Sequence, residues 1–281
     1  MTSYILLSIS VILFSSQFVF NQVFEREEGS SFGSSMLFSL YSSVFGFAVL
    51  FVISGFRLNF SMVSLLYAVL YAAVSIAYSV ASVKSFGTVN LSAYSIFAML
   101  GGMLLPSVCG IVLFNEELTF FKLLCYVAVA GALIATIDFK AGNGGAGWYL
   151  GVFVLNGLVG VISVLHQKSV SAVDSFSFLC LARIAAVAGS LLICGLKKQP
   201  LKRIGRKSLW CTLLFAAVNG IGNLFVLMSL RHLPASVQYP VVTGGVMIAS
   251  LLIDVIKREK LSVKNVVGTA VAFAASLMLA F

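Results

Sequence analysis

The sequence predicts an all-α integral membrane protein in which ten transmembrane helices form two inverted five-helix repeats. Three observations lead to this prediction: the composition, ten long apolar runs, and a segment that occurs twice. Hydrophobic residues make up 60% of the 281 residues and charged residues only 10%, and the mean hydropathy is +1.07. Soluble domains carry about a quarter charged residues, so we expect this chain to lie in a lipid bilayer.

Ten apolar runs separated by short polar breaks account for nearly the whole chain. A helix crosses about 30 Å of hydrocarbon with roughly 20 residues. Runs of this length predict helices near residues 3–24, 32–54, 61–83, 90–114, 119–138, 147–166, 175–195, 208–229, 234–256 and 263–281. The runs are continuous, whereas a membrane β-barrel would show alternating segments of about ten residues. The first run is too long for the core of a signal peptide, so we expect it to remain as the first helix.

Two similar segments lie almost half the chain apart. GGMLLPSVCGIVLFNEELT begins at Gly101 and GGVMIASLLIDVIKREKLS begins at Gly244, an offset of 143 residues (244 − 101 = 143). We therefore divide the chain into a first five-helix repeat, residues 1–143, and a second, residues 144–281. The repeated Gly-Gly pairs are expected to be close-packing positions between helices, with a hinge as the alternative.

Each repeat has an odd number of helices, so the second repeat must enter the membrane from the side opposite to the first. Inverted repeats form two similar bundles, and rocking of one against the other exposes a site near the bilayer midplane to each side in turn. The repeat therefore predicts a transporter that works by alternating access.

Basic residues are concentrated in two loops. The net charge is +9, and the segments KKQPLKRIGRK and KREKLSVK hold ten of the 18 Lys and Arg residues. Both segments follow odd-numbered helices, so they lie on one side of the membrane, which totals 13 basic residues against four on the other. This distribution indicates contact with lipid headgroups and not with nucleic acid. The positive-inside rule would place this side in the cytoplasm and both termini outside.

Other segments carry a family resemblance. VLFNEELTFFKLLCYVAVAGALIA and DVIKREKLSVKNVVGTAVAFAASLMLA each join a Glu-containing turn to a helix rich in small residues, and LMSLRHLPASVQYPVV places Pro-Ala-Ser at a helix start. In these features the whole chain resembles the ten-helix EamA-type members of the drug/metabolite transporter (DMT) superfamily. The resemblance implies a carrier with both termini in the cytoplasm, contrary to the charge count. The chain lacks the membrane-embedded Glu of the superfamily's small multidrug exporters, which disfavours proton-coupled export of hydrophobic cations.

Arg183 is the most informative single residue for function. It lies eight residues after Ser175, or about 12 Å into its helix at 1.5 Å per residue. A charge near the middle of the bilayer costs about 2.5 to 3.5 kcal/mol on insertion scales and normally faces a cavity or a partner. Arg183 is therefore expected either to meet an anionic or zwitterionic substrate group or to tie its helix to polar groups of the bundle.

Polar residues inside the helices are the other substrate-binding candidates. Asn219 and Asn223 lie on one helix face and match Ser75 and Ser79 at an offset of 144 residues (219 − 75 = 144). We expect such stripes to converge on a central cavity, with ordinary polar contacts between helices as the alternative. The full set of substrate-binding candidates is Gln17, Asn21, Tyr71, Ser75, Tyr78, Ser79, Asn156, Arg183, Asn219, Asn223, Gln238 and Tyr239.

Catalytic and metal-binding patterns are not found in the sequence. No acidic residue lies at the centre of a predicted helix, and we expect Asp254 and His166, near helix ends, to lie at the membrane interface. The five cysteines show no CxxC or Cys/His clustering and are expected to be small apolar filler. No nucleotide-binding GxxxxGK[ST] loop is present. We therefore predict no catalytic residue, no metal site and no cofactor.

These features favour a secondary transporter, not an enzyme, that moves a small polar metabolite. Amino acids, choline-like compounds, nucleosides and phosphorylated metabolites are the substrate classes considered. A membrane-embedded enzyme, or a channel or receptor without alternating access, is the alternative. Short loops favour the bacterial cytoplasmic membrane as the location. The expected partners are a small-molecule substrate and the lipid bilayer, and the association of two copies into a homodimer is left open.

Overall fold

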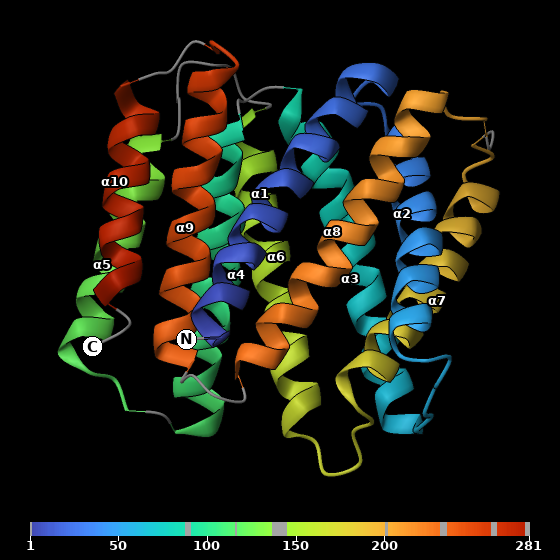
Figure 1. Ribbon diagram of the computed structural model, residues 1–281, viewed down its shortest axis with the longest axis horizontal. Coiled ribbons are helices and arrows are strands. Elements are labelled where there is room, and N and C mark those ends of the chain that lie inside the picture. Colours follow the sequence, from blue (N-terminus) through green and yellow to red (C-terminus); the bar gives the residue numbers. More distant parts are fainter. Residues whose placement is uncertain are drawn as a thin grey trace.

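The computed structural model describes residues 2–87, 91–115, 117–136, 145–199, 202–230, 235–259 and 263–278. Within these ranges the chain forms ten α-helices and no strand, and the helices run up and down side by side (Figure 1). They are α1 (Thr2–Glu28), α2 (Phe32–Ile53), α3 (Met62–Phe86), α4 (Leu91–Phe114), α5 (Phe120–Thr136), α6 (Gly145–Lys168), α7 (Ser175–Leu196), α8 (Arg206–Leu230), α9 (Ala235–Ile256) and α10 (Val263–Met278).

The predicted all-α fold is confirmed, and the predicted helix limits lie within a few residues of those observed. The largest difference is at the end of α1, which continues to Glu28 where the apolar pattern predicted an end near residue 24. The added turn, Glu25 to Glu28, is polar, so the helix continues past the apolar run on which the prediction was based. The ends predicted for the fifth and tenth helices, at 138 and 281, fall outside the described residues.

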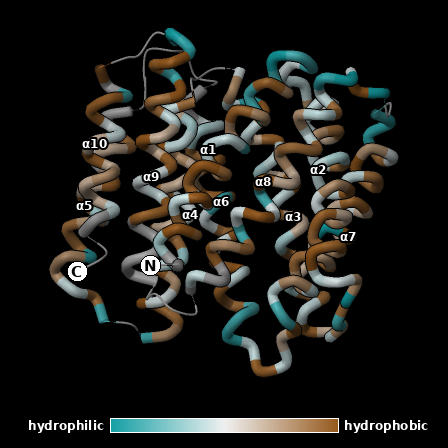
Figure 2. The backbone as a smooth tube through the Cα atoms, in the orientation of Figure 1, coloured by the Kyte–Doolittle hydropathy of each residue, from teal (hydrophilic) through white to brown (hydrophobic). Residues whose placement is uncertain are grey.

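Seven helices of the described part, α1 to α4 and α6 to α8, are long and apolar enough to cross a membrane. The apolar stretches in the other three are shorter: Phe120–Ile134 in α5, Val241–Ile256 in α9 and Asn265–Ser276 in α10. Figure 2 shows apolar residues along the middle of the bundle and polar residues gathered at its two ends. The chain is therefore a membrane-spanning helical protein, and the start of α1 and the end of α10 lie at one end of the bundle (Figure 1).

The centre of the bundle is built from both halves of the chain. Helix α1 packs along α8 and α9, while α6 packs along α3 and α4. Helix α2 lies against α7 and α8, and α5 and α10 pair at one edge of the bundle (Figure 1).

Glycine pairs allow the closest of these helix contacts. A Cβ atom added at Gly101 in α4 would lie 2.0 Å from the backbone oxygen of Phe153 in α6. A Cβ at Gly244 in α9 would lie 2.5 Å from the ring of Phe273 in α10. Real Cβ atoms do not approach other atoms so closely, so the Gly-Gly pairs are close-packing positions, as predicted.

The polar turns at one end of the bundle contact one another. Arg26 at the end of α1 pairs with Glu259 after α9, at 2.5 Å, and Lys207 at the start of α8 pairs with Glu27, at 2.6 Å. Exposed ion pairs contribute little to stability, but these show that the ends of odd-numbered helices share one face, as the sequence predicts. Which face is cytoplasmic stays a prediction.

Two residues expected at the interface are instead buried in protein, which corrects that prediction. Asp254 is fully buried, and its carboxylate accepts a hydrogen bond from the backbone N–H of Ser92 at the start of α4, at 2.7 Å. His166 is 1% exposed, stacks on Phe178 and forms a 2.9 Å hydrogen bond with Ser64 through Nε2. Both sit near helix ends, but neighbouring helices cover them.

Replacing Gly101 with Ala is expected to destabilise the bundle because α4 and α6 would have to separate. Overpacking of this kind costs roughly 1–3 kcal/mol or more. Gly131→Ala in α5 is the matched control, since an added Cβ there meets nothing within 4 Å. Thermal unfolding in detergent should give a clearly lower Tm for Gly101→Ala alone. Equal Tm values for the two variants would contradict the packing described here.

Asp174 should give the protein a measurable dependence of stability on pH. It caps α7 by accepting hydrogen bonds from the N–H and hydroxyl of Ser177, and it accepts another from Asn59. Partial burial raises the pKa of Asp174, but these hydrogen bonds outweigh it and hold the pKa below its usual value. A depressed pKa stabilises the fold above the unfolded-state pKa, and this contribution is lost as pH falls through the folded-state pKa.

We expect Asp174→Ala to lower the unfolding free energy at neutral pH by about 0.5–2 kcal/mol, as for other helix caps. Asp174→Asn keeps an acceptor oxygen but cannot titrate. The Tm difference between the wild type and Asp174→Asn should therefore shrink as the solution is acidified. A difference that does not change with pH would show that the carboxylate charge contributes nothing.

Candidate functional site

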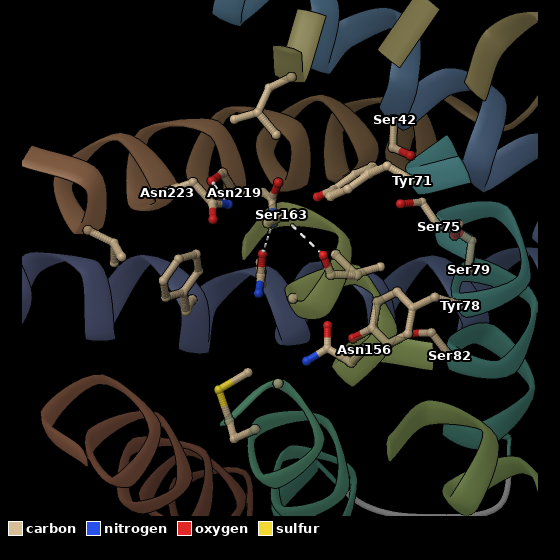
Figure 3. A pocket seen from close by; sticks show the side chains of 18 of the residues that line it. Ser42, Tyr71, Ser75, Tyr78, Ser79, Ser82, Asn156, Ser163, Asn219 and Asn223 are labelled. Atoms are coloured by element: carbon tan, nitrogen blue, oxygen red, sulfur yellow. Dashed lines mark hydrogen bonds between the residues drawn. The ribbon is translucent and has the colours of Figure 1, made fainter. Parts of the chain in front are cut away.

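A cavity of about 320 Å³ lies between the helices of the two halves. Its polar wall comes mainly from α1, α3, α6, α7 and α8, and Figure 3 shows the side chains that point into it. Ten of the twelve predicted substrate-binding residues line this cavity: Gln17, Asn21, Tyr71, Ser75, Tyr78, Ser79, Asn156, Arg183, Asn219 and Asn223. The side chains of the other two, Gln238 and Tyr239, fall outside the described residues. Binding of a substrate by any of the twelve stays a prediction.

A chain of hydrogen bonds joins three helices across the cavity. The Arg183 guanidinium in α7 donates from Nη2 to Asn219 Oδ1 in α8 at 2.9 Å, and Asn219 Nδ2 donates to Gln17 Oε1 in α1 at 2.7 Å. The guanidinium also packs on Gly46, where an added Cβ would lie 3.1 Å from Nε. Arg183 therefore ties α7 to polar groups of neighbouring helices, which was one of the two roles expected for it. It also lines the cavity.

A second hydrogen-bonded group occupies another part of the wall. Asn21 Nδ2 donates to Ser82 Oγ at 2.6 Å, and the Tyr94 hydroxyl lies 2.7 Å from the hydroxyls of both Ser82 and Tyr78. Asn21 Oδ1 has no hydrogen-bond partner in the described part of the protein although it is buried. This group presents hydroxyl donors and acceptors to the cavity.

A proline and an asparagine shape the wall between α4 and α6. Pro106 has no N–H to donate to the carbonyl of Gly102, four residues earlier, and Gly102 lines the cavity. Asn156 in α6 donates to the carbonyl of Ala98 at 2.6 Å. An added Cβ at Gly102 would lie 2.8 Å from Asn156 Nδ2, so the glycine leaves room for this amide.

Several polar residues that line the cavity are not in the predicted substrate-binding set, among them Ser42, Ser82, Ser163, His166, Gln167 and Thr243. The serines are common throughout the helices, so no pattern separates those that face the cavity. His166 was assigned to the membrane interface because of its place near the end of α6. Its repeat partner agrees with a place at the cavity, since His166 matches the candidate Asn21 at an offset of 145 residues (166 − 21 = 145).

The charge of the cavity is positive. Among the described residues that line it, Arg183 is the only Lys, Arg, Asp or Glu. Arginine keeps its charge in proteins, and no carboxylate in this wall neutralises it. In the described ranges, no three His, Cys, Asp or Glu side chains lie close enough together to hold a metal ion. The cavity can therefore offer a cation, amides, hydroxyls and aromatic faces to a small molecule.

A polar cavity enclosed by membrane-spanning helices from both halves of a chain is typical of membrane transport proteins. Residues 146–281 match the sequence model of the EamA-like transporter family. This match confirms the resemblance to EamA-type membrane proteins of the drug/metabolite transporter superfamily. That family consists of transporters, not of enzymes.

The fold also resembles solved structures, and 21 of their chains match. One, titled "Crystal structure of protein", superposes with a TM-score of 0.64 at 15% sequence identity and covers 96% of this chain and 95% of its own. At this identity the likeness shows the fold alone. No curated protein matches the chain significantly.

Replacing Asn219 with Ala should destabilise the protein, because it leaves Arg183 Nη2 and Gln17 Oε1 without their partners. Unpaired buried polar groups cost about 1–3 kcal/mol. The matched control is Ser163→Ala, since Ser163 also lines the cavity but donates only to the carbonyl of Val159 in its own helix. The Tm should fall more for Asn219→Ala than for the control. Equal effects would show that the bridge between α7, α8 and α1 does not contribute to stability.

Proposed function

We propose that this protein is a secondary transporter that carries a small polar metabolite across the membrane by alternating access. The observation that carries the proposal is a cavity of about 320 Å³ between helices of both halves, in which Arg183 and a set of uncharged polar side chains interrupt an otherwise apolar lining. Ligand cavities typically range from about 300 to 1,000 Å³, so this one is suited to a molecule of metabolite size.

Helix contacts support the proposal that residues 1–143 and 144–281 are inverted repeats. The helices of the two halves can be paired in chain order, from α1 with α6 to α5 with α10. Under this pairing, the main contacts between helices have counterparts between the helices paired with them. The contact of α1 with α8 matches that of α6 with α3, and the contact of α4 with α6 matches that of α9 with α1. The contacts of α2 with α7, α4 with α9 and α5 with α10 each join a helix to its own counterpart, as a twofold axis between the halves requires.

One pair of contacts matches residue by residue. A Cβ at Gly102 would meet Asn156, and a Cβ at Gly245 would meet Val11. The two glycines are 143 residues apart (245 − 102 = 143), and their partners are 145 apart (156 − 11 = 145), which are the offsets of the sequence repeat. Such a pair of related bundles can rock about a central site.

Chemistry in the cavity favours an anionic or zwitterionic substrate. Arg183 can meet a carboxylate or phosphate group with charge-assisted hydrogen bonds. The hydroxyls of Tyr71 and Tyr78 and the amides of Asn156 and Asn223 can bind hydroxyl or amine groups elsewhere on the same molecule. Amino acids and phosphorylated metabolites fit this pattern better than choline-like compounds, which carry a cation. We further propose that the protein resides in a bacterial cytoplasmic membrane.

Ligand-induced stabilisation of the purified protein should identify the substrate class. A ligand stabilises the protein by about 2.7 kcal/mol at a hundredfold excess over Kd. Such stabilisation raises the Tm, and we expect a raised Tm with one class among amino acids, quaternary amines, nucleosides and sugar phosphates. Arg183→Gln should lose the shift, whereas Arg57→Gln, which removes an exposed charge outside the cavity, should retain it. A shift retained by a folded Arg183→Gln variant would contradict substrate contact by this arginine.

Counterflow in liposomes separates the transporter from its alternatives. Unlabelled substrate inside the vesicle should accelerate uptake of labelled substrate, and this effect should saturate. A channel or a receptor would show no such trans-stimulation, and an enzyme would release a chemically altered product. Either of these results would overturn the proposed function.

A further inference from the structure

A second hollow of about 420 Å³ lies apart from the polar cavity and is lined only by apolar residues of α2, α3, α6 and α7. Its floor follows one face of α3, where Ala73, Ala77 and Ala81 recur every four residues and therefore lie in line. Ala73 is exposed and Ala77 half-buried. These small side chains leave a groove on the flank of a helix whose neighbours carry larger residues.

Two lysines stand over the aromatic residues that line this groove. Lys84 Nζ, in the last turn of α3, lies 4.8 Å from the ring centroid of Trp148. Lys197 Nζ, just after α7, lies 4.7 Å from the ring centroid of Phe32. Trp148 and Phe32 both line the groove. Helices α3 and α7 end at the same face of the bundle (Figure 1), so the two lysines belong to the same end of the protein.

Neither lysine makes an ion pair with a residue that the structure describes. An ammonium over an aromatic ring at a helix end is held in place but keeps its charge available. Basic pockets between transmembrane helices bind anionic headgroups, and the groove beside these lysines is lined by apolar residues of membrane-spanning helices. The site thus complements an anionic phospholipid. The two lysines suit the negatively charged headgroup, and the apolar groove suits an acyl chain.

We propose that this groove is a binding site for an anionic glycerophospholipid, with one acyl chain along α3 and the phosphate between Lys84 and Lys197. Trp148 and Phe32 separate the two parts of the site. The site is independent of the proposed transport function, because it shares no lining residue with the polar cavity.

Native mass spectrometry of the detergent-purified full chain tests the proposal, with phosphatidylglycerol and phosphatidylcholine of equal chain length as probes. The wild type should retain phosphatidylglycerol preferentially. Replacing both Lys84 and Lys197 with Gln should reduce that preference by about fivefold for each lysine, the factor expected for one basic residue near a charged headgroup. Lys168→Gln is the matched control, because Lys168 also lies over an aromatic ring, Phe114, at 5.5 Å, but not beside this groove.

Ala77→Phe tests the acyl-chain half of the site with both lysines in place. Filling the groove should weaken phosphatidylglycerol binding while the Tm without added lipid stays close to that of the wild type. Equal retention of the two lipids by the wild type, or a preference that survives the double lysine substitution, would overturn the proposal. A dimer that dissociates on Ala77→Phe while lipid binding is unchanged would assign the groove to a second copy and also overturn it.

Discussion

Polar groups buried in a hydrocarbon bilayer need partners from the protein, and this constraint organises the whole structure. An unsatisfied backbone or side-chain group in the membrane costs several kcal/mol. The chain meets this demand by directing its long-range polar contacts inward, above all the bridge from Arg183 through Asn219 to Gln17. A residue that would be costly facing lipid is thereby accommodated where helices of both halves meet.

Close helix packing stabilises this arrangement of buried polar groups. Glycines such as Gly101 and Gly245 bring α4 and α9 tightly against α6 and α1, so dispersion contacts hold the helices where no hydrophobic effect drives them together. The same tight contacts leave the larger polar side chains to border an open volume. Packing and the cavity are therefore two results of one distribution of small and polar residues.

Much of the fold could be predicted from the sequence, because membrane helices are recognisable as long, continuous apolar runs. All ten helices lie close to their predicted positions. The stripe of Asn219 and Asn223 and its partner stripe, Ser75 and Ser79, predicted residues that do line one cavity. His166 and Asp254 were misplaced because nearness to a helix end says nothing about which neighbouring helix covers a side chain. Burial there depends on tertiary contacts that no local pattern contains.

Under the proposed function, the cavity opens to each side of the membrane in turn. A single reactive thiol can be placed in the cavity wall by the substitution Ser75→Cys. The five native cysteines are first changed to Ala or Ser. In vesicles of known orientation, an impermeant thiol reagent should modify this cysteine from either side, and a bound substrate should slow both reactions. Modification from one side only, with or without substrate, would contradict alternating access.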